Sequence, residues 1–189
     1  MKTLFQRFIR KAVRAKNDGN PIVSLRTHLG AIKLELYPRK APIACANFLR
    51  YVQEGRYAGA SFYRTVTLDN QPGANTNIEI IQGGLGFGEN EQRLPPIEHE
   101  GTASTGLRHL DGTLSMTRNE QGASSEFFIC IGAHPQLDEG GARHGDGKGF
   151  AAFGQVIKGM ELVRIIHRMP NKNQMLYSPV KIEIVLQNT

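Results

Sequence analysis

The sequence has no tryptophan and only two cysteines among its 189 residues. Cys45 and Cys130 lie far apart, and neither has a CxxC neighbour, which excludes the common zinc and thiol-redox motifs. Both occur in strongly apolar segments and are predicted to be buried free thiols, although the sequence alone leaves their pairing open. The six histidines are scattered without the paired spacing of a metal site, so we expect no metal.

Long apolar runs are also missing. No segment reaches the ~18 apolar residues of a membrane span, and none has the continuous apolar core of ~7–15 residues that a secretory signal needs. The glycine-rich stretch 83–88 fits neither the dinucleotide-binding nor the P-loop template. Ser124 and Ser125 lack the context of a nucleophile elbow. These absences remove the common nucleotide-binding and hydrolase motifs.

The net charge of +6 is concentrated at the N-terminus. Residues 1–19 hold six of the 23 basic residues and one of the 17 acidic residues, which leaves 20–189 with a net charge of +1. The body therefore lacks a basic stripe, and we expect no nucleic-acid partner. Segment 1–19 is predicted to be a basic amphipathic helix. Either it packs Phe5, Phe8 and Ile9 on its own domain, which we favour, or residues 1–16 weakly contact an anionic surface.

Residues 20–189 are predicted to form one domain in which strands far outnumber helices. Helices are predicted over 42–54 and 159–168. Strands are predicted over 22–26, 31–36, 60–68, 77–81, 113–116, 126–131, 150–157 and 180–187, with a short edge strand at 94–98. Because no alternation of strands and helices appears, the pattern predicts a closed antiparallel barrel.

The stretch 112–132 is expected to organise the chain. Its two apolar runs flank a polar, glycine-bearing connection, which is typical of an antiparallel pair. In a strand over 126–131, Phe128 and Cys130 share one face, and Phe127, Ile129 and Ile131 the other. Two apolar faces indicate a core on one side and an apolar pocket on the other. Ordinary barrel core on both sides is the alternative interpretation.

Five motifs resemble the cyclophilin family of peptidyl-prolyl cis-trans isomerases over residues 21–187. They are FYR at 62–64, IIQGG at 80–84, LSM joined through a polar loop to SSEFFICIG at 114–132, and then LDEGG and FAAFGQVIKGMELV, all in the family's order. The resemblance implies a mostly β fold: a closed eight-stranded antiparallel barrel capped by two α-helices. It also implies a rotamase that assists protein folding and acts on proline-containing polypeptides. We expect a monomer. The family is common in the bacterial cytoplasm and periplasm, and the missing export signal favours the cytoplasm.

The reaction itself needs no cofactor. Amide resonance imposes a barrier of roughly 18–20 kcal/mol on rotation of an X-Pro bond. A donor near the prolyl nitrogen stabilises the twisted amide, because that nitrogen regains its lone pair there. A guanidinium suits this role, since it stays charged and presents several planar donors. By resemblance Arg64 is that catalytic donor; a surface arginine on a strand is the alternative.

The resemblance also assigns the substrate-binding residues. Gln82 matches a glutamine that hydrogen-bonds the substrate backbone. The proline pocket is assigned to four apolar residues, Ile80, Phe128, Leu137 and Phe150. Ordinary core packing is the alternative interpretation of all four. Thr117 and Arg118 stand where the family contacts the peptide flank, and exposed turn residues are the alternative.

Several departures from the family pattern matter. Glu126 replaces the usual glutamine; an ionised carboxylate accepts hydrogen bonds but donates none. It is expected either to pair with Arg64 and orient it, or to compete with substrate for it. Glu79 stands near an aromatic position, and the connection from Arg64 to Gln82 is unusually long. Gln136 replaces a tryptophan of some members, which disfavours tight cyclosporin binding. The alternative function is therefore a non-catalytic or weakly catalytic module that binds proline peptides.

Overall fold

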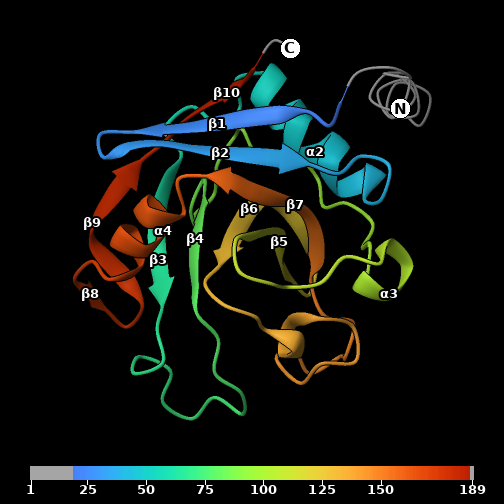
Figure 1. Ribbon diagram of the computed structural model, residues 1–189, viewed down its shortest axis with the longest axis vertical. Helices are drawn as coiled ribbons and strands as arrows, with labels where there is room; N and C mark the ends of the chain where they lie inside the picture. The colour runs from blue at the N-terminus through green and yellow to red at the C-terminus, as the bar shows by residue number, and fades with distance from the viewer. Residues whose placement is uncertain (1–18, 188–189) are drawn as a thin grey trace.

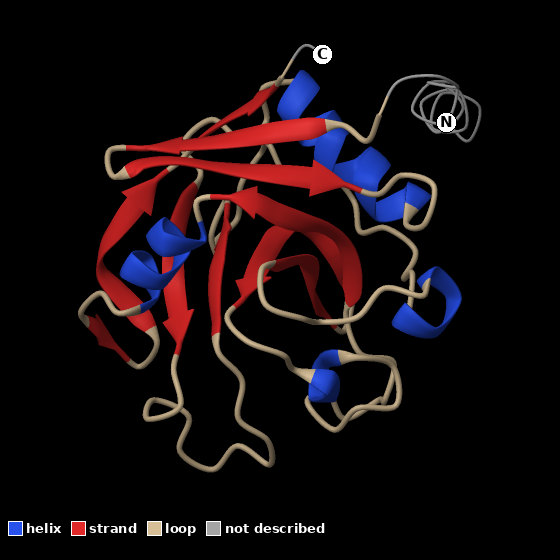
Figure 2. Ribbon diagram, in the orientation of Figure 1, coloured by secondary structure: helices blue, strands red, loops and turns tan. Residues whose placement is uncertain are grey.

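The computed structural model describes residues 19–187. The predictions for the basic segment 1–19, including contact of residues 1–16 with an anionic surface, lie essentially outside the described residues. Within 19–187, no helix combines the length and apolar character needed to cross a bilayer. One sheet dominates the molecule, and short helices lie around it (Figure 1, Figure 2).

Ten antiparallel strands form this sheet, in the order β10-β1-β2-β7-β5-β6-β4-β3-β9-β8. The strands are β1 (Ile22–Thr27), β2 (Gly30–Leu36), β3 (Ser61–Val66), β4 (Ile80–Gly84), β5 (Thr113–Asn119), β6 (Gly122–Cys130), β7 (Ala151–Lys158), β8 (Asn171–Lys172), β9 (Met175–Lys181) and β10 (Glu183–Leu186). The helices are α2 (Pro42–Gln53), α3 (Thr102–Thr105), α4 (Met160–His167) and the 3-10 helix η1 (Pro135–Leu137). The mostly β prediction is confirmed.

The predicted closed eight-stranded barrel is wrong in strand number and in closure. Among the described residues no strand pairing joins β10 to β8, the two ends of the sheet. The strand predicted over 180–187 is divided at Ile182, because β9 pairs with β3 and β10 pairs with β1. The two-residue strand β8 adds a further member beside β9. One switch of partner and one short hairpin thus account for the difference.

Other elements begin or end at residues that differ from the predicted ones, for local reasons. The connection predicted to be a polar loop after residue 116 instead continues both strands, and Asn119 pairs with Gly122 around a tight turn. The edge strand predicted at 94–98 shrinks to a single bridge between Ile97 and Ala123. The strand predicted over 77–81 starts only at Ile80. The side chain of Gln71 accounts for this shift, because it hydrogen-bonds both backbone groups of Ile78.

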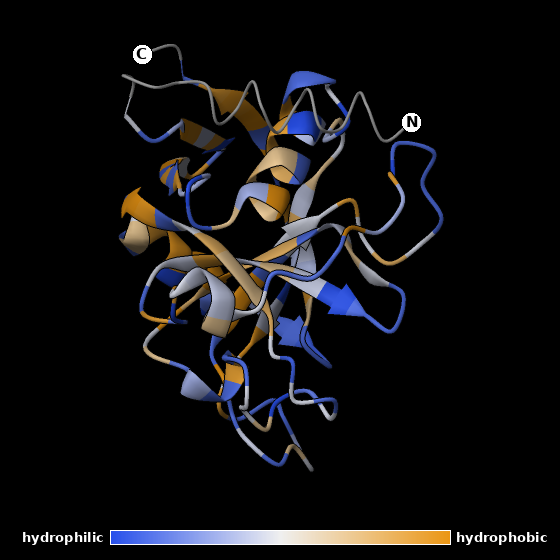
Figure 3. Ribbon diagram, turned by 90° about the vertical axis from the view of Figure 1, so that its right-hand side faces the viewer, coloured by the Kyte–Doolittle hydropathy of each residue, from blue (hydrophilic) through white to orange (hydrophobic). Residues whose placement is uncertain are grey.

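The two predicted helices are present, and each covers strands. Pro42 occupies the first turn of α2, where a missing N–H costs nothing. The carboxylate of Glu100 accepts hydrogen bonds from the Ile43 and Ala44 amides at 3.0 and 2.7 Å, so a distant residue caps this helix. Helix α2 packs on β6, β7 and β10, whereas α4 packs on β2, β3 and β4. Figure 3 shows hydrophobic residues concentrated in these strands and helices.

The two faces of β6 bury two separate apolar clusters. Phe127 and Ile129 belong to the larger core, where Phe127 meets Phe48 edge-on with ring centroids 5.5 Å apart. Phe128 and Cys130 belong to a smaller cluster on the opposite face. The predicted alternation is confirmed. Both cysteines are free and buried, as predicted.

Candidate active site

A β-bulge in β3 places two consecutive polar side chains on one face. Phe62 lies opposite Gly83 and Arg64 lies opposite the next residue, Gln82, so Tyr63 is an extra residue without a partner. Phe62 is fully buried in the larger core. The bulge lets Tyr63 and Arg64 both turn away from that core toward the face of the smaller cluster.

Hydrogen bonds from two glutamines hold the guanidinium of Arg64. Its Nη1 donates to Gln82 Oε1 at 2.8 Å, and its Nε donates to Gln174 Oε1 at 3.0 Å. Nη2 also donates to Gln174 Oε1. Gln174 adopts a left-handed backbone, with φ of 71°, and its Nε2 donates to the carbonyl of Asn70 at 3.0 Å. Desolvation lowers the pKa of Arg64. The result is a half-buried cation of fixed orientation.

Among the described residues Glu126 forms no hydrogen bond or ion pair with Arg64, so direct pairing, one of its two predicted roles, is wrong. Tyr63 donates to Glu126 Oε2 at 2.5 Å, and Gln82 Nε2 donates to the Tyr63 hydroxyl at 2.7 Å. On β6 it is Phe128 that lies opposite Gln82, which leaves Glu126 two residues further on, beside the bulge. We call Arg64, Gln82, Tyr63 and Glu126 the polar relay. The carboxylate reaches the guanidinium only through two intermediate side chains.

The four predicted pocket residues lie together. Ile80, Phe128 and Leu137 are at most 4% exposed and form one cluster, against which the half-buried Phe150 packs. The Phe128 and Phe150 rings meet edge-on at 5.6 Å. Because Phe128 opposes Gln82 and Gln82 opposes Arg64, this apolar cluster shares its face with the fixed cation.

The family model described as cyclophilin type peptidyl-prolyl cis-trans isomerase/CLD matches residues 22–186. The chain belongs to this family. It is 38% identical over 173 residues to a peptidyl-prolyl cis-trans isomerase of Acinetobacter baylyi, covering 86% of this chain and 83% of that one. It is 36% identical over 171 residues to peptidyl-prolyl cis-trans isomerase A of Dickeya dadantii, covering 88% and 82%.

The fold agrees with that assignment. A crystal structure of a Cryptosporidium parvum cyclophilin type isomerase, determined in the presence of the dipeptide Ala-Pro, superposes with a TM-score of 0.67 at 25% identity. The superposition covers 89% of this chain and 99% of that chain. The predicted family is therefore confirmed, and with it the prediction of a peptidyl-prolyl isomerase.

Thr117 and Arg118 of this cyclophilin lie within β5, and Arg118 is not a free turn residue. Its Nε donates to the Gly149 carbonyl at 2.7 Å, and its Nη1 and Nη2 donate to Asp146 at 2.8 and 2.5 Å. The guanidinium also lies 5.7 Å from the centre of the Phe150 ring. Arg118 therefore braces the loop that carries Phe150. The pKa of Asp146 is far below its usual value, chiefly because Arg118 donates to it.

A buried polar triad that the sequence did not reveal supports the smaller apolar cluster at Phe128. His109 Nδ1 lies 2.7 Å from Asp138 Oδ1, and its Nε2 lies 3.0 Å from Ser115 Oγ. The imidazole stacks on Phe128 at 5.8 Å with an interplanar angle of 17°. Ser115 is fully buried, so no substrate carbonyl reaches it. The triad fixes the orientation of Phe128 and takes no part in nucleophilic chemistry.

His109 makes stability depend on pH. Desolvation lowers its pKa below the ordinary 6.5, against the opposing effect of Asp138. Below that value the unfolded chain binds more protons than the folded one, so the free energy of unfolding falls as the solution is acidified, until the pH passes the lower folded pKa. We expect urea unfolding at pH 8 to 5 to show this slope, and His109→Asn to flatten it. An unchanged slope in the variant would assign the effect to another group.

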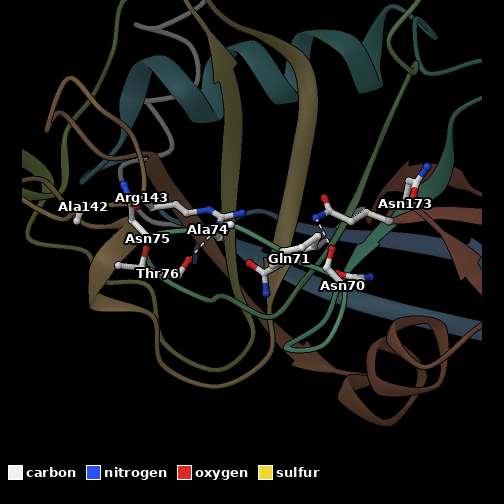
Figure 4. A pocket seen from close by; sticks show the side chains of 11 residues that line it. Asn70, Gln71, Ala74, Asn75, Thr76, Ala142, Arg143 and Asn173 are labelled. Carbon is white, nitrogen blue, oxygen red and sulfur yellow. Dashed lines mark hydrogen bonds between the residues drawn. The ribbon is translucent and has the colours of Figure 1, made fainter.

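A cavity of about 640 Å³ lies beside Gln174, one of the two glutamines that hold Arg64. The long β3–β4 connection lines it together with Ala142, Arg143, Asn173 and Gln174 (Figure 4). None of the site residues predicted from the sequence lines this cavity. Gln174 and Tyr63, which hold the predicted donor in place, were also missed. Gln174 lies 110 residues from Arg64, and no local pattern marks it.

Proposed function

We propose that this cyclophilin accelerates cis–trans isomerisation of X-Pro bonds in polypeptides, and so assists folding, with Arg64 as the stabilising donor. One observation carries the proposal: a guanidinium held by two side chains shares its face with a buried apolar cluster. Such a pairing suits a substrate with an apolar ring and a nitrogen that gains basicity during rotation.

Arg64 contributes through preorganisation. Three hydrogen bonds hold its Nε, Nη1 and Nη2, so the guanidinium does not reorient as the amide twists. A guanidinium has five N–H groups, which leaves two for the substrate. Gln82 and Glu126 then act mainly as positioning residues through the polar relay, and Glu126 does not compete for the cation.

The proline ring is proposed to enter beside Phe150, because that side chain is the half-exposed member of the predicted pocket. Phe128, Leu137 and Ile80 form the floor beneath it. Thr117 and Arg118 flank the peptide on the β5 side, with Arg118 acting through its brace on the Phe150 loop. Monomeric state and cytoplasmic location remain predictions of the sequence.

The deciding experiment measures isomerisation of a proline tetrapeptide beside direct binding of the same peptide. We expect both binding and acceleration. Binding without acceleration would favour the alternative, a non-catalytic module. Glu126 does not support that alternative, since Tyr63, Leu85 and Ser125 already donate to its carboxylate.

The polar relay predicts an effect of Tyr63→Phe. The change removes the acceptor of Gln82 Nε2 and one donor to Glu126, leaving buried polar groups unpaired at a cost of about 1–3 kcal/mol. Because Gln82 is then free to turn, we expect kcat to fall roughly tenfold, less than the 10²–10³-fold cost of removing a preorganised donor outright. Stopped-flow isomerisation and urea unfolding measure the two effects.

Tyr57→Phe is the matched control. Tyr57 is buried and donates to the Ser125 carbonyl at 3.1 Å, but it belongs to the core and not to the relay. It should lose similar stability and keep the wild-type kcat. Equal kcat losses in both variants would show that the relay has no special role.

A further inference from the structure

The cavity beside Gln174 has a lining suited to an anion. Its eleven lining residues include no Asp or Glu and a single charged side chain, Arg143. The others are small residues or carry amide or hydroxyl groups: Asn70, Gln71, Pro72, Gly73, Ala74, Asn75, Thr76, Ala142, Asn173 and Gln174. In Figure 4 the Arg143 side chain extends inward from one end, while Asn70 and Asn173 lie at the other.

Arg143 is not neutralised by any described residue. Its Nη1 donates to the Thr76 carbonyl at 2.7 Å, and no ion pair between residues 19 and 187 includes it. Arg118, by contrast, is paired through two nitrogens with Asp146. Burial lowers the pKa of Arg143, as expected for a cation that has lost water without gaining a carboxylate.

A second unsatisfied group lies in the same lining. The hydroxyl oxygen of Thr76 is buried and has no hydrogen-bond partner among the described residues. Because this oxygen is buried, a ligand in the cavity meets the guanidinium of Arg143 and not this hydroxyl. A carboxylate accepts charge-assisted hydrogen bonds from a guanidinium.

The sheet places this cavity on one flank of the reaction centre. Across neighbouring strands, Ser115 opposes Phe128, Phe128 opposes Gln82, and Gln82 opposes Arg64. Gln174 lies on the far side of Arg64, next to Met175, the Arg64 partner in β9. Arg64 therefore stands between the β5 side, with Thr117, and the cavity.

We propose that this cavity is a subsite for an acidic side chain of the client polypeptide, with Arg143 binding its carboxylate. The acidic residue belongs to the part of the client chain that runs from the proline at Arg64 toward β9. The long β3–β4 connection supplies most of the lining, so its extra residues set specificity. This proposal rests on the proposed function, because it places the rotating X-Pro bond at Arg64.

The test compares peptides that differ only by Glu or Gln at one of three positions before or three positions after the proline. In the wild type we expect Glu to raise kcat/KM roughly three- to tenfold, on one side of the proline only, mainly by lowering KM. Arg143→Gln should abolish the Glu/Gln ratio, and Arg143→Lys, which keeps the charge, should retain part of it.

Arg26→Gln is the control for net charge, since Arg26 lies on β1 and is exposed. It should leave the Glu/Gln ratio unchanged. A ratio near one in the wild type, a ratio that survives in Arg143→Gln, or an equal loss in Arg26→Gln would each overturn the subsite. Failure of the wild type to isomerise any peptide would instead reject the proposed function, and calorimetric binding of the Glu and Gln peptides then tests the subsite alone.

Discussion

Arg64→Ala is expected to lower kcat/KM for a proline tetrapeptide by about 10²–10³-fold, the usual cost of removing one preorganised donor. The loss arises because water in the vacated space reorients during rotation, whereas the guanidinium held by Gln82 and Gln174 does not. Stability should fall only slightly, since the side chain is half-buried and its two glutamine acceptors can bond water. Isomerase kinetics and thermal unfolding measure the two quantities.

Arg64→Lys separates charge from geometry. Lysine keeps the positive charge but presents a single ammonium, which cannot donate to Gln82, Gln174 and a substrate in one plane. We expect an activity between those of the wild type and Arg64→Ala. Near wild-type turnover in Arg64→Ala would show that the guanidinium takes no part in the mechanism. If Arg64→Ala does not fold, Arg64→Lys becomes the decisive comparison.

Features set by short-range pattern were predictable from the sequence. The alternation in 126–131 predicted two apolar faces, and Phe127 and Phe128 do lie in separate clusters. Pro42 marked the start of α2, and the predicted end at residue 54 lies one residue beyond Gln53. The ordered motifs identified the family, which the match over residues 22–186 confirms.

Features set by contacts between distant segments were not predictable. The division of the last strand at Ile182 depends on its pairing with two different strands, which no local pattern shows. Glu126, which stands where the family usually has glutamine, was expected either to pair with Arg64 or to compete with substrate for it. The bulge at Tyr63 determines instead which side chains meet. Gln174 reaches Arg64 only because β8 and β9 fold back beside β3.

Phe127→Ala and Phe128→Ala should separate the stability of the fold from the function of the site, although the two residues are adjacent. Phe127 is fully buried and meets Phe48, Tyr57 and Phe62 with ring centroids 5.5 to 6.0 Å apart. Its truncation is expected to lower the free energy of unfolding by about 3–5 kcal/mol. The folded fraction should keep kcat/KM within a few-fold, since the side chain points away from Arg64.

Phe128→Ala is expected to be destabilising as well, because the side chain is 2% exposed, but its main effect should be on catalysis. Losing the ring removes the floor of the proposed proline pocket and the surface on which His109 stacks. We expect kcat/KM to fall at least tenfold. A tenfold fall corresponds to about 1.4 kcal/mol of transition-state stabilisation lost with the ring contact. Phe127→Leu and Phe128→Leu leave a smaller void than the alanine variants and should keep the protein folded. Urea unfolding and isomerase assays on all four variants should show mainly a loss of stability at Phe127 and mainly a loss of activity at Phe128. A parallel loss of stability and activity at both positions would mean that the two faces of β6 do not divide core from site.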